Sequence, residues 1–159
     1  MTMMWIEAHG TYCCPICTRD YPHSHDPLMW IGVDFDGTIA YQVYNRTSPY
    51  ELGEPIIEMV NRVKDWISKG YEVKLLTARM NKMSSLGMER DLVKMERILK
   101  DWCFKHVGVE LECTNMKDGW MDVLWDDRAV TADPNTGQST VIKLKLEIED
   151  LKRQLQLKL

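Results

Sequence analysis

The sequence predicts an α/β fold, a three-layer sandwich with a mostly parallel sheet. Short apolar runs alternate with amphipathic stretches through the middle of the chain, and strands that alternate with helices of this length indicate βαβ units. The first and last apolar runs, residues 28–33 and 122–125, are nearly all apolar. This composition is typical of strands that are buried on both faces of a parallel sheet.

Four strands are expected in the middle of the chain. Each is a short apolar run that stops at a charged or turn-forming residue, as a buried strand does. The expected strands cover residues 28–33, 72–77, 109–113 and 122–125.

Two amphipathic helices are expected between these strands. The first has Pro55 just inside its start, where a missing N–H costs nothing, and it ends at Gly70. The second begins near Ser84 or Ser85. Their apolar faces consist of side chains three or four positions apart: Ile56, Val60, Val63 and Ile67 in the first, and Leu92, Met95, Leu99 and Trp102 in the second.

Length and composition indicate one globular domain with a small segment at each end. The chain has 159 residues, of which 45% are hydrophobic and 28% charged, and its net charge is −4. This charge argues against a basic surface for nucleic acid. No run approaches the roughly 20 apolar residues of a membrane span, and the first residues lack the features of a signal peptide. We therefore expect a soluble, cytoplasmic protein.

Composition divides the chain into three parts. Residues 1–27 hold most of the cysteines and histidines, and residues 28–135 contain the alternating strands and helices. Residues 136–159 are a charged, leucine-rich run that follows a turn-forming stretch. We expect a Cys/His-rich segment, an α/β core and an amphipathic helix, in that order.

The first part contains a candidate zinc site. Its cysteines and histidines have the spacing C-x2-C-x5-H-x-H, and thiolates together with imidazoles suit tetrahedral Zn²⁺. A structural metal would explain how so short and proline-rich a segment folds; an unmetallated surface arm is the alternative. The expected ligands are Cys14, Cys17, His23 and His25, with His9 and Cys13 as spare donors.

Acidic residues follow two of the predicted strands. The first strand ends in DFDGT over residues 34–38, the second in TAR over residues 77–79, and the last in Asp126 and Asp127. Sites of open parallel sheets lie outside the carboxyl ends of the strands, and oxygen-only ligands favour a hard cation such as Mg²⁺. Gly37 permits a sharp turn and can offer its N–H to an anion. Ordinary turn residues are the alternative for each motif taken alone.

These motifs resemble those of the haloacid dehalogenase (HAD) superfamily. Residues 31–39 (IGVDFDGTI) are similar to its first motif, residues 74–79 (KLLTAR) to its second, and residues 123–127 (VLWDD) to its acidic fourth motif. Taken together, the core is most similar to small HAD-like proteins of bacteriophage and bacterial genomes. The resemblance implies a Rossmann-like sheet and a hydrolase of the host cytoplasm, if the chain is phage-encoded.

The resemblance also implies a phosphatase with an aspartyl-phosphate intermediate. Asp34 is expected to be the nucleophile, Asp36 the general acid and base, and Thr77 a hydrogen-bond donor to the phosphoryl group. Mg²⁺ is expected to bind Asp34, Asp126 and the main-chain carbonyl of Asp36, with Asp127 in or near that shell. The residues expected to contact substrate are Gly37, Thr38, Ala78, Arg79 and Arg46.

The family also uses a lysine or arginine to stabilise the negative charge. Lys117 is the expected residue, although it precedes Asp126 by only nine positions. That spacing leaves little room for a helix, so Lys82 and Arg79 remain alternatives.

The gaps in which the family inserts cap domains are short in this chain. Tyrosines and one arginine in residues 39–54 suit a base, a sugar or an anion, so a nucleotide or similar small phosphate is the expected substrate. Two alternatives remain. One is a phosphatase of nucleic-acid terminal phosphates, and the other is a non-catalytic HAD-fold protein for binding or assembly.

The last part of the chain carries a coiled-coil pattern. Apolar residues recur at intervals of three and four over two heptads, with charged residues beside them. Such a stripe either pairs with another chain or packs on its own domain. We expect a homo-oligomer formed through this helix. The stripe consists of Val141, Leu144, Ile148, Leu151 and Leu155.

Overall fold

A computed structural model describes residues 6–8, 11–13, 29–132 and 135–156 of the chain. The chain divides into two compact units, residues 1–127 and 128–159, and each is described by itself. The predicted α/β fold is confirmed, because the first unit contains an all-parallel sheet with helices between its strands. The expected zinc ligands Cys14, Cys17, His23 and His25 lie outside the described residues. None of the described helices is long and apolar enough to cross a membrane.

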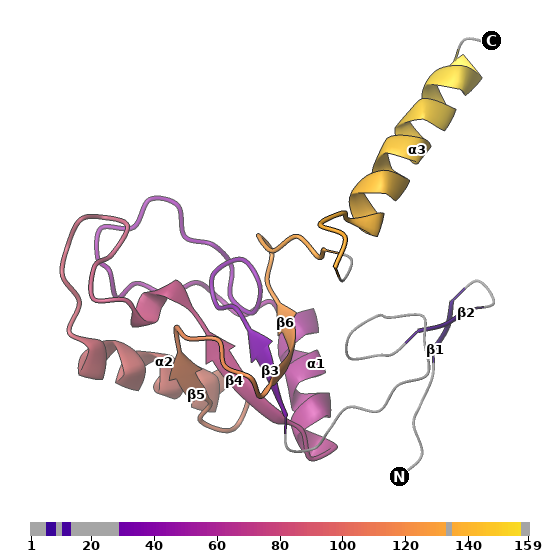
Figure 1. Cartoon of the computed structure of the whole chain (residues 1–159). Coiled ribbons are helices and arrows are strands. Elements are labelled where there is room, and N and C mark those ends of the chain that lie inside the picture. The colour runs from indigo at the N-terminus through magenta and orange to yellow at the C-terminus, as the bar shows by residue number, and fades with distance from the viewer. Residues whose placement is uncertain (1–5, 9–10, 14–28, 133–134, 157–159) are drawn as a thin grey trace. The chain divides into compact units, whose positions relative to one another are not determined.

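The central sheet has four parallel strands in the order β5-β4-β3-β6 (Figure 1). Its strands are β3 (Trp30–Val33), β4 (Glu72–Leu76), β5 (Glu112–Thr114) and β6 (Met121–Trp125). All four correspond to predicted strands. A separate two-stranded antiparallel pair is formed by β1 (Ile6–Ala8) and β2 (Thr11–Cys13).

The helices are α1 (Ile57–Ser68), α2 (Leu92–His106) and α3 (Thr140–Gln156), and η1 (Ala78–Met80) is a short 3-10 turn. The predicted start of the second helix near Ser84 is wrong. The Ser84 hydroxyl instead accepts a hydrogen bond from the Met88 N–H at 3.1 Å, within a turn. Asp91 caps α2, because its carboxylate accepts the Lys94 N–H at 3.1 Å.

One face of the sheet forms the core with both α1 and α2. The connections from β3 to β4 and from β4 to β5 step in the same direction across the sheet, and right-handed crossovers of this kind place both helices on the same face. Alternate strand residues and the buried helix faces accordingly belong to one hydrophobic cluster. Its central members are Ile31, Val33, Val73, Leu75, Val60, Val63, Met95 and Leu99.

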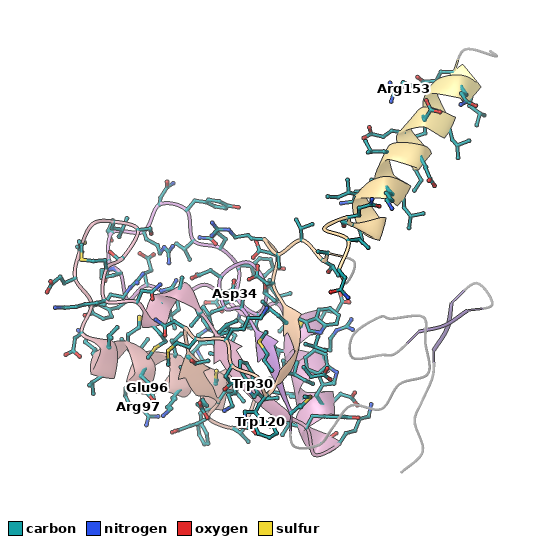
Figure 2. All side chains as sticks on the ribbon, viewed as in Figure 1. Trp30, Asp34, Glu96, Arg97, Trp120 and Arg153 are labelled. Atoms are coloured by element: carbon teal, nitrogen blue, oxygen red, sulfur yellow. The ribbon has the colours of Figure 1, made fainter. Side chains whose placement is uncertain are left out.

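The other face of the sheet is packed closely around Gly32. A Cβ at this position would lie 3.0 Å from Met121 Sδ and 3.1 Å from Leu124 Cδ1. Trp30, at the start of β3, is 2% exposed, and its indole N–H donates to Asp118 at 2.9 Å. Figure 2 shows Trp30 and Trp120 at one end of the sheet and Asp34 at the other. The sheet thus separates a tryptophan-rich end from an acidic end.

Candidate functional site

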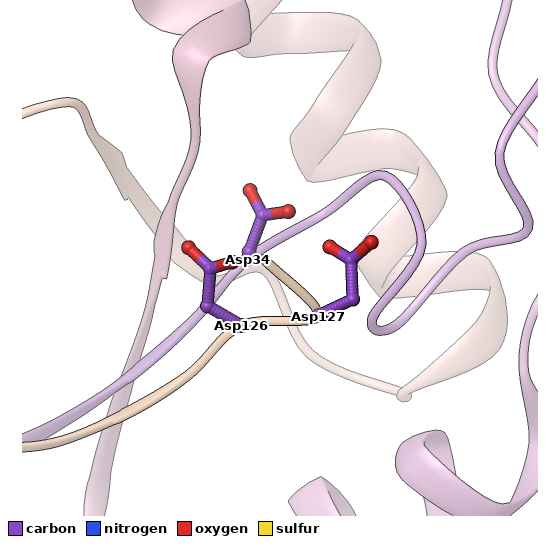
Figure 3. Close-up of side chains that lie close together, drawn as sticks. All are labelled: Asp34, Asp126 and Asp127. Atoms are coloured by element: carbon purple, nitrogen blue, oxygen red, sulfur yellow. The ribbon is translucent and has the colours of Figure 1, made fainter. Parts of the chain in front are cut away.

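Three aspartates lie together where β3 and β6 end. The two strands are parallel neighbours with Val33 paired to Trp125, so their carboxyl ends are level. The Asp34 N–H donates to the Trp125 carbonyl at 2.8 Å, which extends the pairing into the site. Asp34, Asp126 and Asp127 each offer a carboxylate oxygen within 4.8 Å of the others (Figure 3). This is the arrangement that could hold a divalent cation.

Burial and neighbouring negative charges both raise the pKa of Asp34. Burial of its carboxyl raises the pKa from 3.8 to about 6, a hydrogen bond from the Phe35 N–H opposes the shift, and the charges of Asp126, Asp36 and Asp127 add to it. The ionised form of Asp34 therefore costs free energy in the metal-free site. A cation among these carboxylates would relieve that cost.

The raised pKa of Asp34 makes the metal-free chain less stable as pH rises. The folded state holds a proton on Asp34 up to about pH 6, whereas the unfolded state releases it near 3.8. Stability from this group is therefore present at low pH and is lost between these two values. In EDTA, we expect the melting temperature of the wild type to fall between these two pH values because of Asp34. Asp34→Asn should lack this part of the fall. Identical pH dependence of the two melting temperatures would contradict this.

The turn after Asp34 packs closely against Asp127. Gly37 has a φ of +91°, and a Cβ there would lie 2.6 Å from Asp127 Oδ2. The Thr38 hydroxyl accepts the Asp127 N–H at 3.0 Å, which ties the same turn to the end of β6. Glycine is thus required at this position both by its backbone conformation and by the carboxylate beside it.

Gly37→Ala is expected to destabilise the fold and to displace Asp127. Gly70→Ala is the matched control, because Gly70 has a similar φ of +86° but no neighbouring atom within 4 Å of a Cβ. The left-handed backbone should cost each variant about 1 kcal/mol. We expect Mg²⁺ to raise the melting temperature of wild type and of Gly70→Ala, but not that of Gly37→Ala. Equal responses to Mg²⁺ in both variants would show that the contact with Asp127 is unimportant.

The carboxylate of Asp36 is bound by arginines. Arg79 donates a hydrogen bond to each of its oxygens, with Nε 2.6 Å from Oδ2 and Nη2 2.7 Å from Oδ1. The Arg46 Nη1 lies 3.6 Å from Oδ2. The close cluster of possible metal ligands contains Asp34, Asp126 and Asp127; the Asp36 side chain is part of this ion-paired group instead.

Arg79 also holds the loop that follows the first motif. It is 1% exposed, and its guanidinium donates to the Pro49 carbonyl at 3.2 Å and to the Glu51 carbonyl at 2.9 Å. Sequence reasoning assigned Arg79 to substrate contact. Its partners in the structure are Asp36 and two backbone carbonyls, so Arg79 connects the Asp36 carboxylate to this loop.

Thr77 lies just beyond β4, near the level of Asp34. Its N–H donates to the Thr114 carbonyl at 2.8 Å, and its hydroxyl accepts the Arg79 N–H at 3.2 Å across Ala78. The side chain is 3% exposed. Three neighbouring strands therefore deliver the first, second and acidic motifs to one end of the sheet.

Lys117 lies in the connection from β5 to β6. It is exposed, and the next residue, Asp118, accepts the hydrogen bond from Trp30 at the start of β3. This is the end of the sheet opposite to Asp34. The structure therefore does not bring Lys117 to the carboxylates, whereas Arg46 contacts Asp36 directly.

Arg90 is a buried arginine near Arg79 and Arg46 that the sequence analysis did not single out. It is 8% exposed, and its Nη1 donates to the Ala78, Asn81 and Met83 carbonyls at 3.0–3.3 Å. Burial lowers its pKa, and the charges of Arg79 and Arg46 lower it further. No short sequence pattern marks such a residue, because its partners are backbone atoms of an irregular turn.

The comparisons with known proteins leave the family open. No protein-family model and no curated protein matches the chain. A solved structure described as a conserved protein coded by a locus from Bacteroides thetaiotaomicron is 24% identical to it, with a TM-score of 0.43. The match covers 76% of this chain and 91% of that one. At this similarity the match carries no argument about the site.

Proposed function

We propose that the chain is a Mg²⁺-dependent phosphomonoester hydrolase of the HAD type, with a Rossmann-like core. The observation that carries this proposal is the cluster of Asp34, Asp126 and Asp127 at the ends of adjacent parallel strands. Thr77 follows the next strand at the same end. A carboxylate nucleophile, acidic metal ligands and a hydroxyl for the phosphoryl group are the parts that such chemistry needs.

The acidic cluster fits a magnesium ion. Its donors are carboxylate oxygens, and the half-buried Asp34 carries a raised pKa because of burial and like charges. Asp34 and Asp126 would hold the ion together with the main-chain carbonyl of Asp36, and Asp127 would lie in or near that shell. When bound, Mg²⁺ supplies neutralisation of charge on the phosphoryl oxygens and on the aspartates.

Asp34 and Asp36 divide the covalent chemistry between them. A carboxylate oxygen of Asp34 bonds to phosphorus while the bond from phosphorus to the leaving oxygen breaks. Asp36 gives that oxygen a proton, which requires that Asp36 first takes up a proton from water and gives up one of its two bonds to Arg79. In the second step a water attacks phosphorus, Asp36 takes a proton from the water, and the Asp34–phosphorus bond breaks to release phosphate. Thr77 and the turn at Gly37 and Thr38 would orient the phosphoryl group.

Arginines organise the acid–base residue in this scheme. The two-point ion pair with Arg79 fixes the orientation of the Asp36 carboxylate, so Arg79 is a positioning residue. Arg46 is only 14% exposed at its side chain and contacts one oxygen of Asp36. It is the cation that we propose for stabilising the phosphoryl charge, in place of Lys117.

A nucleotide or similar small phosphate is the proposed substrate. Tyr41 and Tyr44 follow the first motif and are 61% and 87% exposed, so their rings are available to stack on a base or sugar. Arg46 lies in the same loop. These features support a substrate with an aromatic part and an anionic part.

The test is phosphate release from nucleoside monophosphates, sugar phosphates and oligonucleotides with a terminal phosphate, in Mg²⁺ and in EDTA. We expect release from a nucleotide in Mg²⁺ and none in EDTA. Preference for the oligonucleotides would favour the nucleic-acid alternative. Absence of release across the whole panel would favour the non-catalytic alternative.

A further inference from the structure

We propose that α3 pairs with α3 of a second copy as a parallel, two-stranded coiled coil. The five seam residues recur at intervals of three and four along the helix. Each of their side chains is between 50% and 65% exposed within the described residues. This proposal does not depend on the proposed enzymatic function. The seam consists of Val141, Leu144, Ile148, Leu151 and Leu155.

The residue types along the seam specify two strands. With Val141 at position a of a heptad, Ile148 and Leu155 also occupy a positions, and Leu144 and Leu151 occupy d positions. Two of the three a residues are therefore β-branched. β-Branched side chains at a with leucine at d favour parallel dimers over trimers and tetramers. The residues of the seam therefore favour a pair of helices over a larger bundle, and they are also the surface that the pair would bury.

The charges beside the seam specify the orientation. Lys145 and Lys152 occupy e positions, and Glu147 occupies a g position. In a parallel pair, g of one helix faces the following e of the other, so Glu147 meets Lys152 of the second copy twice per dimer. In an antiparallel pair with Ile148 of one helix packed against Leu151 of the other, e faces e, which brings Lys145 of one copy to Lys152 of the other. Only the parallel arrangement joins opposite charges.

Leu146 of α3 lies off the seam and provides a matched control. Leu146 is 58% exposed, close to the 57% of Leu151, but it occupies position f on the far side of the helix. A charge at Leu151 would enter the interface, whereas a charge at Leu146 would not. Both substitutions replace the same residue type with the same change of charge.

The experiment measures the mass of the full chain in solution over a range of concentrations by sedimentation. We expect a reversible rise from 18.6 kDa to twice that value. Leu151→Glu should weaken the dimer at least tenfold, and Leu146→Glu should not. A chain that stays monomeric at all concentrations, or that forms trimers or tetramers, would overturn the proposal.

A charge substitution decides the orientation. Lys152→Glu places two acidic residues together in a parallel dimer, so its dissociation constant should rise about fivefold at low salt, and the difference should shrink at high salt. The double variant Glu147→Lys/Lys152→Glu restores opposite charges and should recover the affinity. In an antiparallel dimer Lys152→Glu would instead pair with Lys145 and tighten binding. Tighter binding would therefore overturn the parallel arrangement.

Discussion

Asp34→Asn is expected to reduce Mg²⁺-dependent phosphate release by at least about 10³-fold, because the amide cannot act as the nucleophile. The substitution is nearly isosteric and removes a charge that burial and neighbouring aspartates disfavour. The variant should therefore fold at least as well as the wild type when metal is absent. Activity and stability are thus expected to change in opposite directions.

The measurement compares phosphate release and melting temperature for wild type, Asp34→Asn and a control. Asp65→Asn is suitable as the control, because Asp65 is exposed on α1 and pairs with Lys69. It should keep wild-type activity. Release that survives Asp34→Asn would exclude Asp34 as the nucleophile. A loss of folding in that variant would contradict the account of its unfavourable charge.

Arg79→Met is expected to cost the fold about 3 kcal/mol, since it leaves a largely buried carboxylate with only the longer contact to Arg46. The side chains of Arg79 and Asp36 are 2% and 17% exposed. The methionine would fill much of the space but would leave Asp36 and the carbonyls of Pro49 and Glu51 without these donors. Activity should also fall, because Asp36 and the loop would lose their fixed positions.

Arg97→Met is the matched control for this prediction. Arg97 also contacts one aspartate, Asp101, through two nitrogens, but its side chain is 53% exposed. Exposed ion pairs contribute little to stability, so urea unfolding of this variant should resemble that of the wild type. A similar change in both variants would mean that burial of the Arg79–Asp36 pair has no special role.

Arg79→Lys separates charge from geometry. Lysine keeps the positive charge but lacks the planar fork that binds both oxygens of a carboxylate. We expect stability and kcat between those of wild type and Arg79→Met. Wild-type values for the lysine variant would show that charge alone is sufficient.

Local patterns were sufficient to predict the strands of the central sheet. The apolar runs that end at Asp34 and Asp126 form neighbouring parallel strands, so the prediction that both acidic motifs reach one end of the sheet follows from α/β topology. The second helix was placed too early, because Ser84 and Asp91 are both good caps by type. Which of the two is used depends on the turn that Arg90 and Ser84 stabilise between them.

Patterns of adjacent or regularly spaced residues were enough to predict the α/β class, the mostly parallel sheet and the acidic motifs. The contacts of those motifs became visible in the folded chain alone. Arg79 binds Asp36 across 43 positions of sequence, and Arg46 joins the same carboxylate from a loop. Lys117 precedes Asp118, which accepts a hydrogen bond from Trp30 at the opposite end of the sheet. Partner choice among charged side chains depends on distance and burial, and both are set by packing rather than by spacing along the chain.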